Sequence, residues 1–471
     1  MKIIRFSESN MLAKVFPISF QKIAIVLVAV GLLCAVSVKA QGPTLTFNPN
    51  GAGEITEAIV DDVLEIQFGP GVGRWGNSQP FIATFGPGVT TIGDYAFAGC
   101  ADMTLTSLPA GLQSIGMYGF GFCFRMVITS TTLPASVTTI GYGAFTECYE
   151  LVLTSLPSGL QTIDFLAFNK CSKLALTSLP AGLQTIGGQA FDVCIGLTSM
   201  SLPTGITSVG ISVFRDCKNL QTVSLPSDWT TIPTQTFDGC TSLYSVSLPP
   251  GLLNIDQSAF RGCSLLVLTS LPSGLQTIGN YAFNVCRSLA LTSLPPGLQS
   301  IGTDAFYGCW NLALTSLPSG LLTIGGSAFG DCRKLAITSL PPGLSIINNN
   351  VFESCSSLVK IKIPKSVKTI GAQGFYRSML LDSVIFEESD PNEITIGANA
   401  FHYNPILPNV KFYFPDGSDI SAWETKLGTE AIGRVFIDPA TLPPPPLPAG
   451  SVRIGGTVKM GKGATLNIGK P

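Results

Sequence analysis

The sequence predicts an elongated solenoid of about 14 rungs of about 23 residues each, where a rung is one turn of the coiled chain. Its expected architecture is a parallel β-sheet on one face, with short helical turns and loops on the other. Two observations predict this fold class: a phenylalanine recurs at a nearly constant period, and a cysteine follows three residues after nearly every one of them. Such a period is typical of solenoids, because each repeat buries its apolar side only by stacking on its neighbours.

The phenylalanine column sets the limits of the array. Its period is the same almost throughout, and it is slightly longer only from Phe120 to Phe145 and from Phe375 to Phe401. We therefore expect one continuous repeat domain over residues 86–405, although the chain is long enough for several domains. The column consists of Phe97, Phe120, Phe145, Phe168, Phe191, Phe214, Phe237, Phe260, Phe283, Phe306, Phe329, Phe352, Phe375 and Phe401.

Charge is scarce along the whole chain. Charged residues make up 12% of the sequence, about half of the usual share, and the formal net charge is -2. Gly, Ser, Thr and Pro are plentiful, so we expect a neutral surface rich in hydroxyl groups. The sequence has no basic footprint of the kind that binds nucleic acid, and we expect no nucleic-acid partner.

The N-terminus has the layout of a signal peptide over residues 1–40. Basic residues including Lys14 and Lys22 precede an uncharged apolar run over residues 23–38, and small or aliphatic side chains precede a cleavage point after Ala40. The run is short for a membrane-spanning helix. A lipoprotein anchor on Cys34 is the alternative, but Leu33 stands where that signal needs a small residue. We expect a secreted or cell-surface protein with no membrane span in the mature chain.

Twelve of the thirteen cysteines form a second column. Each follows a repeat phenylalanine by three residues, and Ser378 and Asn404 take this position in the last two rungs. One cysteine per rung favours reduced, buried thiols that act as small apolar side chains. Disulfides between adjacent rungs and metal binding are the alternatives, but no histidine lies near these cysteines in the sequence and CxxC spacing is missing. We expect no metal and no cofactor.

The segment after each cysteine carries the strand. In the rung that begins at Cys217, apolar residues at Leu220, Val223 and Leu225 follow the L-x-x-L-x-L pattern, and Pro226 closes the segment. This pattern is that of leucine-rich repeats. The predicted fold class is therefore a leucine-rich repeat solenoid.

A second apolar position, such as Ile92 or Ile232, precedes the turn that carries the phenylalanine. The next residue is Gly in most rungs, with Asp or Asn in some and Pro233 in one. Proline excludes a positive φ at this position, whereas the N-cap of a one-turn helix tolerates the whole set. We expect a short helical turn with Ala96 and Cys100 on one face, and a stacked spine of phenylalanines.

The strand segments are of two kinds. After Cys194, Cys217, Cys240 and Cys355, the sixth residue past the cysteine is apolar and the fifth is polar. After seven other cysteines the order is reversed, and an aliphatic fifth residue precedes threonine. These seven aliphatic residues are Leu105, Leu153, Leu176, Leu268, Leu291, Leu314 and Ile337.

Side chains alternate between the two faces of a strand. If every rung kept one register, the seven aliphatic residues would form an exposed stripe, which is our candidate partner-binding face. A one-residue adjustment of the backbone would instead turn them inward and expose hydroxyl groups. The burial of Leu176 and Leu291 distinguishes the two interpretations.

The unit I-G-x-x-A-F-x-x-C-x-x-L, followed by L-P-x-x-L, resembles the repeats of the BspA-like, or Treponema-type, leucine-rich repeat surface proteins. The resemblance covers most of the mature chain. It implies a surface or secreted protein with a role in adhesion or recognition, and it implies no particular ligand. Residues 410–424 are similar to the strand and helix that often close such arrays.

The remaining segments complete the predicted organisation. We expect an N-terminal cap over residues 41–85, a C-terminal cap over 406–437 and a proline-rich linker over 438–450. Residues 451–471 alternate apolar side chains around a Gly-Lys-Gly turn and carry four basic residues, so they resemble a β-hairpin. This tail is either a sorting or wall-attachment signal or a simple extension.

Three functions compete at this point. The first is adhesion or recognition, in which the solenoid face binds an extracellular protein or a glycan. The second is a structural envelope or spacer role without a specific ligand, which the near-identical rungs favour. The third is a carbohydrate-active enzyme, which needs clustered carboxylates that the sequence does not offer. His402 is the single histidine, and it has no nucleophile partner in sequence, so we expect no enzyme activity and no catalytic residue.

Overall fold

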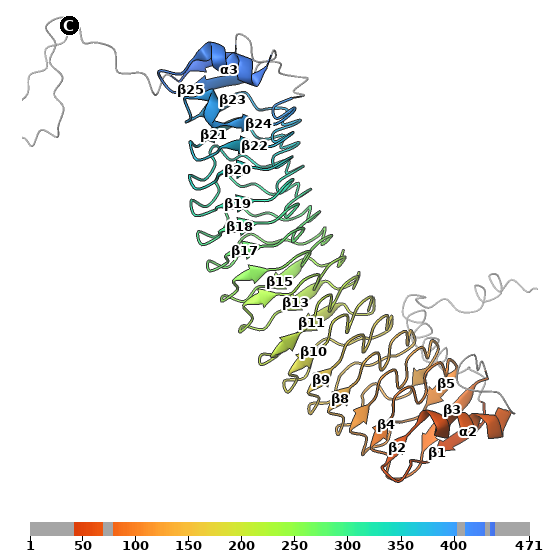
Figure 1. Cartoon of the computed structure of the whole chain (residues 1–471). Helices are drawn as coiled ribbons and strands as arrows, with labels where there is room; N and C mark the ends of the chain where they lie inside the picture. The colour runs from red at the N-terminus through yellow and green to blue at the C-terminus, as the bar shows by residue number, and fades with distance from the viewer. Residues whose placement is uncertain (1–41, 69–78, 403–409, 429–433, 439–471) are drawn as a thin grey trace, which may run out of the picture.

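The computed structural model describes residues 42–68, 79–402, 410–428 and 434–438. The chain coils into an elongated solenoid, and its path bends between β15 (Ser245–Ser247) and β17 (Thr277–Ile278) (Figure 1). Parallel strands recur once in every repeat, which confirms the predicted leucine-rich repeat solenoid. The predicted signal peptide, the linker from residue 439 onward and the basic tail lie outside the described residues.

The first stack consists of the strands that follow some of the repeat cysteines, together with strands near the two ends of the array. It is interrupted, and forms three separate parallel sheets among the described residues: β1-β3-β5-β7, β11-β13-β15 and β21-β23-β25-β26. Its strands are β1 (Thr44–Phe47), β3 (Phe81–Phe85), β5 (Met103–Leu105), β7 (Val127–Ile128), β11 (Ser199–Ser201), β13 (Thr222–Ser224), β15, β21 (Lys360–Ile363), β23 (Ser383–Phe386), β25 (Lys411–Phe414) and β26 (Val435–Ile437).

A second stack, not predicted from the sequence, runs along another side of every rung. Each of its strands has two residues, usually Thr or Ser followed by an inward-facing Ile, and neighbours pair in parallel with a shift of one repeat. The described part of this stack forms three parallel sheets, with breaks between Val209 and Thr231 and between Ile324 and Ile346. The strands are β2 (Glu54–Ile55), β4 (Thr91–Ile92), β6 (Ser114–Ile115), β8 (Thr139–Ile140), β9 (Thr162–Ile163), β10 (Thr185–Ile186), β12 (Ser208–Val209), β14 (Thr231–Ile232), β16 (Asn254–Ile255), β17, β18 (Ser300–Ile301), β19 (Thr323–Ile324), β20 (Ile346–Ile347), β22 (Thr369–Ile370) and β24 (Thr395–Ile396).

The third side of each rung consists of β-turns where a one-turn helix was expected. In the first rung, the N–H of Ala96 donates to the carbonyl of Gly93 at 3.3 Å, and the N–H of Cys100 donates to that of Phe97 at 3.1 Å. The residues between, Tyr95 and Gly99, have φ of 56° and 79°, as the third position of a type II turn requires. These left-handed residues prevent an α-helix. Ala96 and Cys100 are nevertheless both buried, as predicted.

Alternate N–H groups on this side bond to the next rung. The N–H of Tyr95 donates to Met117 O at 2.7 Å, and that of Phe97 donates to Gly119 O at 2.8 Å. Each rung is therefore joined to its neighbour along the turns as well as along the second stack. This double row of bonds satisfies backbone groups that would otherwise be buried without partners.

The phenylalanine column forms the predicted spine. Successive rings from Phe97 to Phe401 stack with centroids 5.3–5.8 Å apart and interplanar angles of 3–18°. Almost all of these rings are fully buried. Beside them runs the column of twelve cysteines, all buried as free thiols in the described structure.

Both ends of the spine are covered by aromatic side chains. At the N-terminal end, Phe47 of β1 meets Phe97 edge-on at 5.0 Å, and α2 (Glu57–Phe68) buries Val60 and Leu64. At the C-terminal end, Phe412 of β25 meets Phe401 edge-on at 5.3 Å. These contacts keep the first and last rungs from exposing the core.

Among the residues that the structure describes, helices lie only near the two ends of the array. Beyond β23, a 3-10 turn, η1 (Pro391–Glu393), precedes the last turns of the array, and α3 (Ile420–Leu427) packs over β25. The indole of Trp423 in α3 stacks on Phe414 at 4.0 Å and donates from Nε1 to the carbonyl of Ser389 at 3.0 Å. Within the described ranges, no helix combines the length and the apolar character needed to cross a bilayer.

Candidate functional site

The seven aliphatic residues of the candidate stripe face the core. Their exposed fractions lie between 0 and 8%, with Leu176 at 1% and Leu291 at 0%. These side chains are therefore not available to a partner, and the candidate face built on them is wrong. The alternative interpretation, in which the backbone turns them inward, is confirmed. The buried residues are Leu105, Leu153, Leu176, Leu268, Leu291, Leu314 and Ile337.

Parity explains why the leucines turn inward. The third and eighth residues past the cysteine, such as Leu174 and Leu179, face inward in most rungs, and they lie five positions apart, an odd spacing. Strict alternation cannot connect two inward positions at that spacing, so each rung must place two adjacent residues outward. In the rung after Cys171 this pair is Thr177 and Ser178, which are both exposed.

The position of the outward pair distinguishes two kinds of rung. In the strand rungs, which follow Cys194, Cys217, Cys240 and Cys355, the pair is the fourth and fifth residues. The seven rungs of the buried aliphatic residues above, in which threonine is the sixth residue past the cysteine, we call the threonine rungs. In these rungs the outward pair is the sixth and seventh residues, an exposed Thr and an exposed Ser. The strand face, as we call the outward side of the first stack, thus carries these exposed pairs: Thr106 and Ser107, Thr154 and Ser155, Thr177 and Ser178, Thr269 and Ser270, Thr292 and Ser293, Thr315 and Ser316, and Thr338 and Ser339.

Between consecutive threonine rungs the strand face is open. Neighbouring rungs share a bond near the cysteine, such as that from the N–H of Ala313 to Leu291 O at 3.0 Å. Among the described residues, however, the backbone N–H groups of Thr292, Ser293 and Ser316 make no backbone hydrogen bond. This is why the first stack is interrupted there. The exposed hydroxyl pairs lie beside backbone donors and acceptors that water or a ligand can use.

Where a threonine rung precedes a strand rung, the two remain bonded. The N–H of Ser201 donates to Thr177 O at 2.9 Å, and the N–H of Leu179 donates to Ser201 O at 3.0 Å. The same pair of bonds joins Thr338 and Leu340 to Lys362 near the other end of the array. In this order, the outward Thr and Ser do not prevent pairing.

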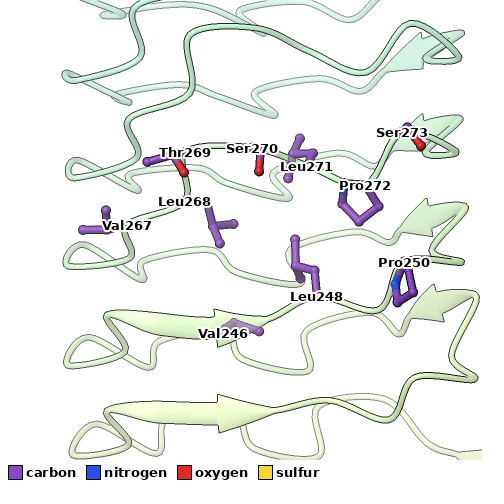
Figure 2. Close-up of a pocket in the computed structure, with 10 residues that line it drawn as sticks. All are labelled: Val246, Leu248, Pro250, Val267, Leu268, Thr269, Ser270, Leu271, Pro272 and Ser273. Carbon is purple, nitrogen blue, oxygen red and sulfur yellow. The ribbon is translucent and has the colours of Figure 1, made fainter.

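The opposite order occurs once among these rungs, where the strand rung of β15 precedes the threonine rung of Cys263. Here the N–H of Val267 donates to Tyr244 O at 3.1 Å, but no backbone bond joins residues 247–250 to 269–273. A groove of about 410 Å³ opens between the two rungs. Figure 2 shows Leu248 and Leu268 beside the space between the rungs.

The groove combines an aliphatic floor with a polar rim. Its floor includes Val246 and Leu268, which are only 7% and 8% exposed, and the half-buried Leu248 and Leu271. The rim carries the exposed hydroxyls of Thr269 and Ser270, together with Ser273 and two prolines (Figure 2). Its volume lies in the range of small-ligand sites, roughly 300–1,000 Å³.

The groove and the open face beyond it are uncharged. No charged residue occurs in residues 264–286, 288–303 or 310–330. The nearest cluster of charge is at the border, where the guanidinium groups of Arg287 and Arg333 lie over the Trp310 ring at 4.5 and 4.2 Å. Trp310 Nε1 donates to Asp331 Oδ2 at 2.7 Å, and Arg333 also pairs with Asp331 at 3.0 Å. The two guanidinium groups and one carboxylate leave this cluster with a net positive charge.

Other charges pair along the turn side. Arg215 donates to both carboxylate oxygens of Asp192, at 3.0 and 2.7 Å, and Arg261 does the same to Asp238, at 2.8 and 2.9 Å. Burial raises the pKa of the Asp192 carboxyl, and the guanidinium of Arg215 only partly offsets that effect. These pairs hold adjacent rungs in register and lie away from the strand face.

The described structure contains no group of three or more His, Cys, Asp or Glu side chains that could hold a metal ion. A second hollow of about 600 Å³, near α2, is lined by acidic residues that include Glu54, Asp61 and Asp94.

Burial raises the pKa of the thiols in the cysteine column from Cys123 to Cys355, so these thiols are neutral and poor nucleophiles. The open Thr–Ser face and the groove are therefore the features best suited to binding.

Several solved structures are similar to this chain. A leucine-rich repeat protein from Bacteroides ovatus is 28% identical, and the match covers 70% of this chain and 83% of that one, with a TM-score of 0.51. A leucine-rich cell surface protein from Faecalibacterium prausnitzii is 24% identical over 61% and 88% of the two chains, with a TM-score of 0.34. The pneumococcal vaccine antigen PcpA is 15% identical over 72% and 92%, with a TM-score of 0.30.

The family comparison identifies the repeats. None of the curated proteins matches the sequence. The model of the BspA type leucine rich repeat region matches six copies, over residues 83–187, 163–290 and 276–408. These matches span well over half of the chain and agree with the predicted repeat unit. The chain belongs to the BspA-type leucine-rich repeat family.

Proposed function

We propose that this protein is a secreted or cell-surface recognition protein that binds an extracellular protein or glycan along its strand face. A leucine-rich repeat solenoid is typically a binding scaffold. The signal-peptide-like N-terminus and the adhesion role implied by the family resemblance support an extracellular place of action. No enzyme activity is part of this proposal.

The observation that carries the proposal is the difference between the two stacks. On the second stack, neighbouring rungs of the described array pair at every junction except those between β12 and β14 and between β19 and β20, and usually one Thr or Ser per rung faces outward. On the strand face, threonine rungs expose two hydroxyls each, and backbone groups beside them are unpaired. A surface of unpaired polar groups can form directional bonds to a partner, whereas the paired stack offers few.

A spacer role without a ligand is the competing function, and the near-identical rungs favour it. It predicts that the protein binds no matrix protein or glycan under conditions where it is folded. It also predicts that bulky substitutions on either stack have the same negligible effect on cell adhesion. The binding proposal predicts a difference between the two stacks.

The test uses the protein expressed from its full sequence. Ser316→Tyr places a bulky ring on the strand face, and Thr323→Tyr places the same ring on the second stack of the same rung; both positions are exposed. We expect binding to a panel of matrix proteins and glycans to fall with Ser316→Tyr and to persist with Thr323→Tyr. Equal binding by both variants, or no binding by the folded wild-type protein, would contradict the proposal.

Localisation is tested separately. Cells that produce the full sequence should deliver the mature protein to the medium or to the cell surface, where added protease digests it. If the protein stays in the cytoplasm with its N-terminus intact, the extracellular part of the proposal is wrong. Mass spectrometry of the mature N-terminus checks the expected cleavage after Ala40.

A further inference from the structure

The groove between β15 and the rung of Cys263 is the most specific feature of the strand face. We infer that it is a binding site for a neutral glycan chain, which continues from the groove onto the open Thr–Ser face. This inference rests on the proposed function and specifies its ligand class and its principal site. Three independent observations support it.

The first observation is the chemistry of the lining. A sugar ring presents C–H groups on its faces and hydroxyl groups around its edge. The groove offers the matching arrangement, with aliphatic carbon from Val246, Leu248 and Leu268 below and hydroxyls from Thr269 and Ser270 at the rim. The accessible lining of the groove is more polar than apolar, so directional hydrogen bonds would contribute more to binding than apolar contact.

The second observation is the unpaired backbone along the groove. Leu179, in the bonded order of rungs, donates its N–H to Ser201 O at 3.0 Å. The corresponding N–H of Leu248 makes no backbone hydrogen bond, and neither does the N–H of Ser270 across the groove. Both are donors for which the fold supplies no backbone partner. Hydroxyl and ring oxygens of a sugar can accept from them without bringing a charge into the site.

The third observation concerns charge and period. A neutral partner fits because residues 264–286 carry no charge that would attract an ionic one. The Thr–Ser pair recurs at Thr292 and Ser293, and again at Thr315 and Ser316, on rungs about 4.8 Å apart. A polymer of hydroxyl-bearing units can therefore repeat the same bonds on successive rungs. A compact ligand would use the groove alone.

Two exposed serines in identical local sequence provide the matched variants. Ser270 and Ser178 both lie in the sequence Leu-Thr-Ser-Leu-Pro, but Ser270 lines the groove, whereas Ser178 forms a bridge with Ser201 at a bonded junction. Ser270→Tyr fills the groove with a ring, and Ser178→Tyr puts the same ring at an equivalent place without a groove. Thr269→Val removes one rim hydroxyl and adds no bulk.

The experiment measures binding of neutral hexasaccharides of glucose, mannose and xylose to the full-length protein by titration calorimetry. A hexagalacturonate is the charged comparison, and an extended peptide of neutral composition is the protein-like comparison. We expect at least one neutral hexasaccharide to bind, Ser270→Tyr to weaken it by about tenfold or more, and Ser178→Tyr to leave it within about twofold. Thr269→Val should weaken it severalfold. Circular dichroism and thermal unfolding should show that all variants fold like wild type.

Several results would overturn the inference. If the two tyrosine variants lose the same affinity, or neither loses any, the glycan does not occupy the groove. If only the peptide binds, and Ser270→Tyr abolishes that binding, the site exists but its ligand class is wrong. If the protein binds matrix proteins through the strand face and no saccharide at all, the proposed function stands without this inference. If the folded protein binds nothing in either panel, both fail.

Discussion

The thiol of Cys217 donates a hydrogen bond from Sγ to the carbonyl oxygen of Phe191, in the preceding rung, at 3.1 Å. The same bond recurs from Cys123 onward at 3.0–3.2 Å, so the two columns are connected rung by rung. Ser378, which takes the cysteine position, makes the equivalent bond to Phe352 O at 2.7 Å. The column is therefore a donor position, as well as a place for a small apolar side chain.

Substitution of Cys217 should separate these two roles. Cys217→Ala removes the thiol donor and leaves the carbonyl of Phe191 with the N–H of Cys194, at 3.3 Å. It also opens a small void, so we expect the free energy of unfolding to fall by about 1–2 kcal/mol. Cys217→Ser keeps a donor, as Ser378 does, and should cost less than Cys217→Ala. Urea unfolding curves measure both. A larger loss for serine than for alanine would show that packing alone matters at this position.

Alkaline pH should destabilise the protein steeply. Burial raises the pKa of the column thiols above their ordinary value of 9.0, so above that pH the folded state retains protons that the unfolded state releases. Stability is then fully present below about pH 9 and is lost as pH rises, by about 1.4 kcal/mol per pH unit for each thiol that titrates. Unfolding free energies at pH 7 to 10 measure the slope. Cys217→Ala removes one titrating thiol and should reduce the slope by about 1.4 kcal/mol per pH unit. An unchanged slope would show that the Cys217 thiol does not cause the pH dependence.

Replacement of a central phenylalanine of the spine by alanine should make the two halves of the array unfold independently. Phe214 stacks on Phe191 at 5.4 Å and on Phe237 at 5.8 Å, and it is almost completely buried. Phe214→Ala should cost about 3–5 kcal/mol, and because rungs contact only their neighbours, thermal unfolding should split into two transitions. Phe214→Leu, which keeps most of the volume, is the control and should unfold in one transition. Differential scanning calorimetry distinguishes the two outcomes.

The pair of Arg261 and Asp238 should show strong coupling. Asp238 is 4% exposed and receives two bonds from Arg261, so Arg261→Met leaves a carboxylate buried without its main partner. Because Arg261 is half exposed, we expect a loss of about 1–2 kcal/mol, which is below the range for fully buried pairs. The double variant with Asp238→Asn should recover part of this loss. A double-mutant cycle with no coupling would show that water replaces the guanidinium.

Hydrogen exchange should map the open and bonded parts of the strand face. The N–H of Ser201 donates to Thr177 O, whereas the N–H of Ser293 makes no backbone bond, although both belong to the same side of the solenoid. We expect the Ser201 amide to be protected and the Ser293 amide to exchange rapidly at neutral pH. Peptide-level mass spectrometry measures both. Similar protection at the two amides would mean that the threonine rungs are paired in solution.

The sequence was sufficient to predict the spine, the cysteine column and the solenoid, because each depends on a residue type that recurs at a fixed period. The orientation of the leucines could also have been derived. Leu174 and Leu179 are apolar at positions five apart, which requires a break in the alternation of faces, and Thr177 with Ser178 is the polar pair available to lie outward. The exposed leucine stripe failed because it applied one register to both kinds of rung.

Other features left no such signal. The left-handed positions of the turns hold residues as varied as Tyr95, Leu166 and Gln235, and glycine takes only some of them, such as Gly99, so no constant glycine marks them. The groove depends on whether two adjacent rungs share backbone bonds, and that is a property of the boundary between them. The only indication in the sequence is the change of rung type between Cys240 and Cys263.

The order of the rungs has an evolutionary consequence. Duplication of a rung within a block of its own kind lengthens the open face and leaves the groove unchanged, because each rung meets only its neighbours. A change in the number of grooves instead requires a new boundary at which a strand rung precedes a threonine rung. Unequal recombination among these near-identical repeats can therefore change the length of the open face without changing the groove. The number of grooves changes only when such a boundary is gained or lost.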